Sequence, residues 1–224
     1  MPAMQQGFLE KLPPFLRTIW VAFLHWWDDL VMQSVMSLLW SLSWLTVVLG
    51  PPLTFGIYYV QSQYVRGENP GLPGLWQGAR KYFWVSWQWM LGNLFVAVVF
   101  YASIDAYNRI GGLAASVGHD LTLLVILVWF ISQFYAIPFL MLQEGQPSLW
   151  RAWRNSLLLT LASPFYLLGL LVFLALFGLV SLLLVFPVVL GFITMLSILA
   201  AQALRDRLET FQALTASEQN ISRK

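Results

Sequence analysis

The chain contains no cysteine and carries little charge: 10% of its 224 residues are charged, whereas 59% are hydrophobic. The lack of cysteine excludes disulfides, thiolate metal sites and cysteine nucleophiles. A soluble domain carries about 25% charged residues, so this chain has too few charges to cover a surface that faces water. The formal net charge of +2 is too small to indicate a nucleic-acid partner, and we expect none.

Long apolar runs take the place of a charged surface. Residues 157–204 contain no Asp, Glu, Lys, Arg or His, although one transmembrane helix needs only about 20 apolar residues. The sequence therefore predicts an all-α, polytopic membrane helix bundle. We expect three regions: an N-terminal interfacial segment (1–29), a transmembrane helical bundle (30–204) and a polar cytoplasmic tail (205–224).

The apolar segments predict five clear transmembrane helices, at residues 30–50, 84–107, 121–142, 163–182 and 187–204. A sixth helix, residues 53–66, is only about 21 Å long at 1.5 Å per residue. We expect it to cross as well, because a weak internal repeat matches it to the clear span 121–142. The matched positions are Pro73, Leu75, Trp76 and Arg80 in the first copy and Pro147, Leu149, Trp150 and Arg154 in the second.

The connecting segments are predicted from their mix of residue types. Residues 8–29 combine aromatic and charged side chains, which favours an amphipathic helix in the headgroup layer of the membrane. The glycine-rich residues 111–120 are expected to form a loop. A hairpin is expected near Phe186 and Pro187, and the tail is expected to begin as a helix and then fray.

The positions of lysine and arginine orient the bundle. With six crossings, all 12 of these residues except Arg109 fall on one side; with five crossings, Lys11 and Arg17 join Arg109. Cytoplasmic loops carry the excess of Lys and Arg. Both counts place residues 67–82, 143–156 and 205–224 in the cytoplasm. We therefore expect a multi-pass protein of the bacterial inner (cell) membrane with a cytoplasmic C-terminus, and we favour a cytoplasmic N-terminus too.

Four basic residues on the two predicted cytoplasmic loops are candidate contacts for anionic lipid or for a partner protein: Arg80, Lys81, Arg151 and Arg154. Simple orientation of the chain is the commoner explanation for such residues. A second candidate feature is structural. Gly50, Pro51 and Pro52 are expected to break the helix and to form a hinge near the non-cytoplasmic interface, because proline lacks the amide donor.

Candidate catalytic groups are missing from the predicted spans. No ionisable residue lies at the centre of a span, and the sequence has no phosphate-binding glycine loop and no metal-ligand spacing. We therefore predict no catalytic residue, no protein-built metal site and no enzymatic activity. His25 and His119 could each ligate a haem or chlorophyll-type metal, so pigment or haem binding stays open, although interfacial histidines are commoner.

Small and amide side chains within the predicted spans are expected to support helix packing. Ser34, Ser37 and Ser41 share one face of the first span, and small polar residues let helices approach and bond across the contact. Packing is the favoured interpretation over a substrate path. The same holds for the amides within or near the spans, which are Gln61, Gln63, Gln88, Asn93 and Gln133.

Two stretches resemble a known family. The sequences GPPLTFGIYY (50–59) and VRGE (65–68), followed by LW (75–76) and RKYF (80–83), are similar to the YesL-like family of bacterial integral membrane proteins. The likeness covers about residues 15–105. It implies an apolar helix, a Pro/Thr/Gly break, a helix with a tyrosine pair and an aromatic-basic helix. The family has no established activity, and its members resemble accessory proteins associated with carbohydrate uptake.

Two functions follow as hypotheses. The first is a non-catalytic accessory or scaffold protein of a bacterial membrane system, linked to carbohydrate uptake by the family resemblance. The alternative is a structural subunit of a large energy-transducing or pigment–protein membrane complex, in which a charge-poor, aromatic exterior faces its partners. Both hypotheses require membrane lipids and other membrane protein subunits as partners.

Overall fold

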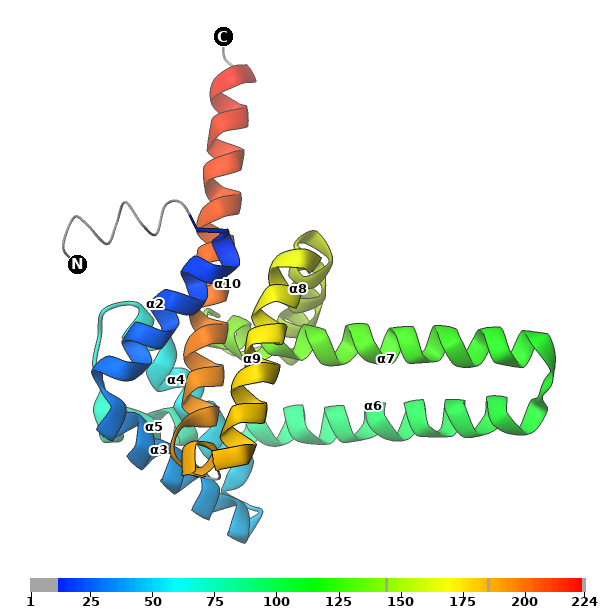
Figure 1. Ribbon diagram of the computed structural model, residues 1–224, viewed down its shortest axis with the longest axis horizontal. Helices are drawn as coiled ribbons and strands as arrows, with labels where there is room; N and C mark the ends of the chain where they lie inside the picture. The colour runs from blue at the N-terminus through cyan, green and yellow to red at the C-terminus, as the bar shows by residue number, and fades with distance from the viewer. Residues whose placement is uncertain (1–11, 144, 185, 223–224) are drawn as a thin grey trace.

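The structure is a computed structural model that describes residues 12–143, 145–184 and 186–222, and Figure 1 shows it as helices joined by short connections. Within that part of the chain, nine α-helices and one 3₁₀ segment follow one another without a strand. Their bounds are α2 (Pro14–Asp28), α3 (Leu30–Ser43), η1 (Trp44–Thr46), α4 (Gly50–Val65), α5 (Gly71–Lys81), α6 (Phe83–Ile110), α7 (Gly112–Met141), α8 (Leu149–Ala162), α9 (Pro164–Leu184) and α10 (Phe186–Ser222). The predicted all-α class is confirmed.

Three helices are long and apolar enough to cross a membrane. They are α6, α7 and the Pro164–Ser181 part of α9. The first two contain 28 and 30 residues, or about 42 and 45 Å at 1.5 Å per residue. Leu30–Thr46 is a shorter apolar helix. By length and composition the chain therefore has the helices of a membrane protein.

Helix α10 forms the centre of the body, where it packs against α2, α3, α4, α7 and α9. Its contact surface combines bulky and small residues, and Met195, Leu199 and Ala203 are fully buried. Gly191 lets the ring of Trp26 approach, because a Cβ added there would lie 2.4 Å from the ring. Figure 1 shows α2, α4 and α9 around this central helix.

Helices α6 and α7 form a hairpin arm that stands out from the body, crosswise to α9 and α10 (Figure 1). The two helices pack on each other, and a Cβ at Gly118 would lie 2.5 Å from the ring of Tyr107. Gly111, with φ of 68°, makes the turn at the tip, where only glycine adopts that conformation without strain. Apart from this mutual contact, the outer part of the arm is exposed.

The break between the first two apolar helices differs from the predicted one. Residues 30–50 do not form one helix: α3 ends at Ser43, η1 ends at Thr46, and α4 already begins at Gly50. Pro51 and Pro52 therefore lie in the first turn of α4, where a missing amide donor costs nothing. The proline rings clash with a helical backbone in the preceding turn, so the helix is interrupted before the prolines and not at them.

Two other predicted boundaries differ from the structure. Residues 111–120 are not a loop, because α7 begins at Gly112 and only Gly111 separates it from α6. The glycines there serve the tip and the close contact between the two helices. The tail begins as a helix, as expected, but that helix is the continuation of α10, which runs from the apolar core through Ser222. Val185, next to the expected hairpin at Phe186, and residues 8–11 of the predicted interfacial helix lie outside the described residues.

Candidate functional site

The four predicted basic contact residues are exposed, and aromatic rings or backbone groups hold three of them. The guanidinium of Arg80 lies 5.2 Å from the centre of the Trp76 ring, and the ammonium of Lys81 lies between two tyrosine rings. Arg151 donates from Nη2 to the carbonyl of Gln146 at 3.1 Å. These contacts occupy few of the N–H donors of the three side chains.

The structure does not bring the two basic pairs together. Helix α5, which carries Arg80 and Lys81, packs on α4 and α3, whereas α8, which carries Arg151 and Arg154, packs on α7, α6 and α9. Figure 1 shows α5 and α8 well apart on the body. The four residues therefore form two separate basic patches, and neither pair completes a site with the other.

The predicted hinge residues pack against neighbouring side chains, in addition to interrupting the helix. A Cβ added at Gly50 would lie 2.7 Å from the ring of Trp44, so only glycine lets the chain fold back against that ring. Trp40 donates from Nε1 to the hydroxyl of Thr54 at 2.8 Å, which ties α3 to the first turns of α4. The role of Gly50, Pro51 and Pro52 as a hinge stays a prediction, with this packed corner as its structural setting.

Polar residues within the apolar helices bond across helix contacts, as predicted. Ser37 lies 3.2 Å from the Thr194 hydroxyl, and Gln61 donates to Gln33 at 2.6 Å. On the arm, Trp89 donates to Gln133 and Trp129 donates to Asn93, each at 3.2 Å. The packing interpretation is confirmed for Ser37, Gln61, Asn93 and Gln133.

The two histidines lie on separate parts of the fold. The ring of His25 meets Tyr64 edge-on at 5.7 Å, at the contact between α2 and α4. His119 lies on the arm, with Nδ1 3.2 Å from Asp120. Among the described residues, no group of three or more His, Asp or Glu side chains could hold a metal ion. The structure therefore does not bring the two histidines together.

An aromatic pocket of about 440 Å³ lies where the base of the arm meets α3, α4, α9 and α10. Its wall is mostly apolar, and its polar groups are the hydroxyls of Thr54 and Tyr58 and the amide of Gln133. The rings that line it are those of Trp40, Trp44, Tyr58, Trp89, Phe130 and Phe134. Such a pocket suits a flat apolar group or an acyl chain.

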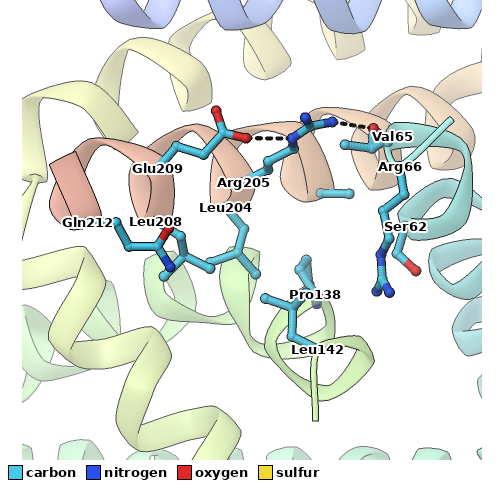
Figure 2. Close-up of a pocket in the computed structure, with 11 residues that line it drawn as sticks. Ser62, Val65, Arg66, Pro138, Leu142, Leu204, Arg205, Leu208, Glu209 and Gln212 are labelled. Atoms are coloured by element: carbon cyan, nitrogen blue, oxygen red, sulfur yellow. Dashed lines mark hydrogen bonds and ion pairs between the residues drawn. The ribbon is translucent and has the colours of Figure 1, made fainter. Parts of the chain in front are cut away.

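A second pocket, of about 140 Å³, lies between the C-terminal ends of α4 and α7 and the middle of α10 (Figure 2). We call it the arginine pocket, because Arg66 and Arg205 line it. Arg205 donates from Nη1 to the Val65 carbonyl at 2.5 Å and from Nε to Glu209 at 2.8 Å. Arg66 donates to the Met141 carbonyl at 3.4 Å. Two cations thus cover carbonyls at two helix ends, where the helix dipole favours positive charge.

A buried polar cluster joins α2, α9 and α10 beyond the apolar core. Asp206 accepts hydrogen bonds from Thr18 at 3.0 Å and from Tyr166 at 3.2 Å, and the guanidinium of Arg207 lies 3.6 Å from the centre of the Tyr166 ring. Thr18 and Tyr166 are buried. This cluster is why the first residues of the predicted tail belong to the body.

Sequence reasoning used Arg66 and Arg205 for orientation alone and did not identify the pocket between them. Each directly follows an apolar segment of the sequence, a pattern that fits many membrane proteins and does not reveal which segments meet. No family model, no curated protein and no solved structure matches the chain. Its function is therefore argued from its own geometry.

Proposed function

We propose that the chain is a multi-pass, non-catalytic accessory or scaffold protein of a bacterial membrane system, and that the α6–α7 arm is its main contact with lipid and partner subunits. The observation that carries the proposal is the exposure of the arm. No residue in the most apolar 18-residue window of α6 is buried, and the side chain of Phe95 is 69% exposed. An apolar surface of this length requires a bilayer or a protein partner to cover it.

The arginine pocket supports the proposed orientation. Arg205 belongs to a segment that the charge count assigns to the cytoplasm, and Arg66 and the C-terminal end of α7 directly precede two such segments. The hydrogen bonds from Arg205 to Val65 and from Arg66 to Met141 join three helices that are distant in sequence. These bonds agree with the proposed topology, in which the three joined regions lie on one side of the membrane.

The direction of the arm depends on the lipid or protein that surrounds it. Transmembrane helices tilt by about 20° on average, and two pairs of helices that lie crosswise cannot both cross one flat bilayer. The proposed five clear crossings, or six with α4, therefore require the outer part of the arm to turn relative to α9 and α10, while the C-terminal end of α7 keeps its contacts with α4 and α10. The bilayer or a partner that covers the arm would set that direction.

The alternative, a structural subunit of an energy-transducing or pigment–protein complex, is favoured by one observation. The aromatic pocket is large, apolar and lined by three tryptophans. A flat pigment ring or a quinone-like ring would stack there on aromatic side chains. The link to carbohydrate uptake rests on the family resemblance alone.

Gentle solubilisation followed by measurement of mass and visible absorbance separates these functions. A colourless complex with a stoichiometric membrane protein supports the accessory function, whereas a visible pigment supports the alternative. A triple variant, Leu94→Ser, Phe95→Ser and Val98→Ser, should lose the partner. The matched control is Val31→Ser, which changes an exposed apolar residue of α3 away from the arm. A monomer of the wild-type chain would contradict both functions.

Single cysteines in this cysteine-free chain test the orientation. Gln77 and Asn155 are exposed on α5 and α8, and Asn108 is exposed near the tip of the arm. With an impermeant reagent in intact cells, we expect labelling of Asn108→Cys and protection of Gln77→Cys and Asn155→Cys. Strong labelling of either of the latter two would overturn the proposed orientation.

A further inference from the structure

We propose that the arginine pocket binds the phosphate of one anionic membrane lipid, with the first part of an acyl chain against its apolar wall. The inference rests on the proposed membrane location and adds a ligand class that the accessory function does not itself supply. The arginine pocket is separate from the two basic patches on the outer surface of α5 and α8, which contain Arg80, Lys81, Arg151 and Arg154.

The two arginines give the pocket more positive than negative formal charge, and they also offset the negative ends of the helix dipoles of α4 and α7. Arg66 and Arg205 contribute two positive charges, and Glu209 contributes one negative charge. A guanidinium has five N–H donors. Arg205 uses Nε and Nη1, and Arg66 uses Nη2 in a long bond of 3.4 Å. Donors on both side chains therefore remain for the oxygens of a phosphate, which arginine binds with charge-assisted hydrogen bonds.

The rest of the lining is apolar. Figure 2 shows Pro138 and Leu142 across the pocket from Arg205, with Leu204 and Leu208 along α10. A free phosphate ion would make no apolar contact with these four side chains. A lipid places its charged group beside the arginines and its chain beside the leucines, so that both halves of the lining are used.

The size of the pocket also favours a lipid that is bound in part. A volume of about 140 Å³ holds roughly four to five groups the size of a water molecule. That is enough for a phosphate and its nearest carbons but not for two acyl chains. The chains must leave along the outside of α7 and α10, which the proposed topology places in the bilayer. Anionic lipids occur in the cytoplasmic leaflet, where these helix ends are proposed to lie.

The test measures thermal unfolding of the purified full chain in a neutral detergent, with added lipid. Phosphatidylglycerol and phosphatidylcholine with the same acyl chains are compared with glycerol phosphate, which has the anion without the chains. We expect phosphatidylglycerol alone to raise the unfolding temperature in a saturable way. Native mass spectrometry should show one retained lipid per chain.

Two kinds of variant locate the site. Arg66→Gln and Arg205→Gln should each weaken phosphatidylglycerol binding by about tenfold. Gln212→Glu adds a negative charge at an exposed position on the rim, so it should weaken binding without disturbing the fold. The matched control is Arg109→Gln, which removes one exposed arginine from the arm and changes the net charge equally.

Three results would overturn the proposal. Equal stabilisation by phosphatidylcholine would show that the headgroup charge is irrelevant, and equal stabilisation by glycerol phosphate would show a site for a free anion. An equal loss of binding in Arg109→Gln and Arg205→Gln would show attraction by net charge alone. These measurements use the isolated chain in detergent, so they can fail while the partner complex of the proposed function is still found.

Discussion

Replacing Gly56 with alanine should push α5 away from α4. Gly56 lies on α4 where the backbone of α5 crosses it, and a Cβ added there would lie 2.5 Å from the carbonyl oxygen of Leu75. The opposing helix is equally close, because a Cβ at Gly78 would lie 2.7 Å from the Cβ of Tyr59. Small residues on both helices thus let the two backbones touch, and a methyl group at Gly56 has no free space.

The size of the effect follows from the gap that must open. Ordinary contacts of a Cβ begin at 3.4 Å, so a distance of 2.5 Å requires α5 to move by 0.9 Å. The atom in the way belongs to the backbone and cannot rotate aside. Overpacking of this kind costs about 1–3 kcal/mol, and the gain in helix propensity from Gly to Ala returns about 0.5–1 kcal/mol. We expect a net loss of about 1–2 kcal/mol, or a fall in Tm of about 2–8 °C for a chain of this size.

Tryptophan fluorescence during thermal unfolding in detergent micelles measures this change. The matched control is Gly178→Ala, which adds the same methyl group to a helix, α9. There the nearest atom is the edge of the Phe192 ring at 3.2 Å, and that side chain can shift. Gly178→Ala should keep the wild-type Tm or raise it slightly. If Gly56→Ala unfolded at the same temperature as Gly178→Ala, the close approach of α4 and α5 would be refuted.

Three further predictions use other contacts. Replacing both Pro51 and Pro52 with alanine should let α3 and α4 join into one helix of about 50 Å, so the protein should be lost from the membrane fraction. Normal accumulation of this variant, with unchanged cysteine accessibility, would contradict the role of these prolines as a hinge. Gln33→Leu leaves the buried amide of Gln61 without its partner and should cost about 1–3 kcal/mol, which the double variant Gln33→Leu/Gln61→Leu should largely recover in the same unfolding assay. Burial lowers the pKa of His25 below its ordinary value, so protonation favours the unfolded chain; Tm should therefore fall as the pH drops below about 6.5, and an equal fall in His25→Gln would contradict this assignment.

The sequence predicted the helical class and most helix positions because both depend on local properties. A low charge and long apolar runs predict apolar helices whatever the tertiary structure is. For that reason the helix predicted at 84–107 lies within α6, and the helix predicted at 121–142 lies within α7 except for its last residue. Prolines act over one turn, so the break near Gly50 was also predictable, although its position before the prolines was not.

The candidate sites depended on contacts that no local pattern contains. Arg205 meets the Val65 carbonyl across 140 positions in the sequence, and Thr18 meets Tyr166 across 148. The sequence around each residue does not indicate which residue it contacts. The two basic pairs looked equivalent in sequence, yet α5 and α8 pack on different helices, so the pairs stay apart. Only the tertiary structure could join the arginines and separate the basic pairs.

The direction of the crosswise arm is the clearest feature of the fold that the sequence alone did not determine. The composition of the arm predicted two apolar helices on either side of a glycine-rich segment. Its direction depends on how the base of the arm packs against α4, α8 and α10, through side chains that are far apart in the chain. Hydrogen bonds within a helix fix its length and its apolar surface, whereas the fit between helices decides where that surface points.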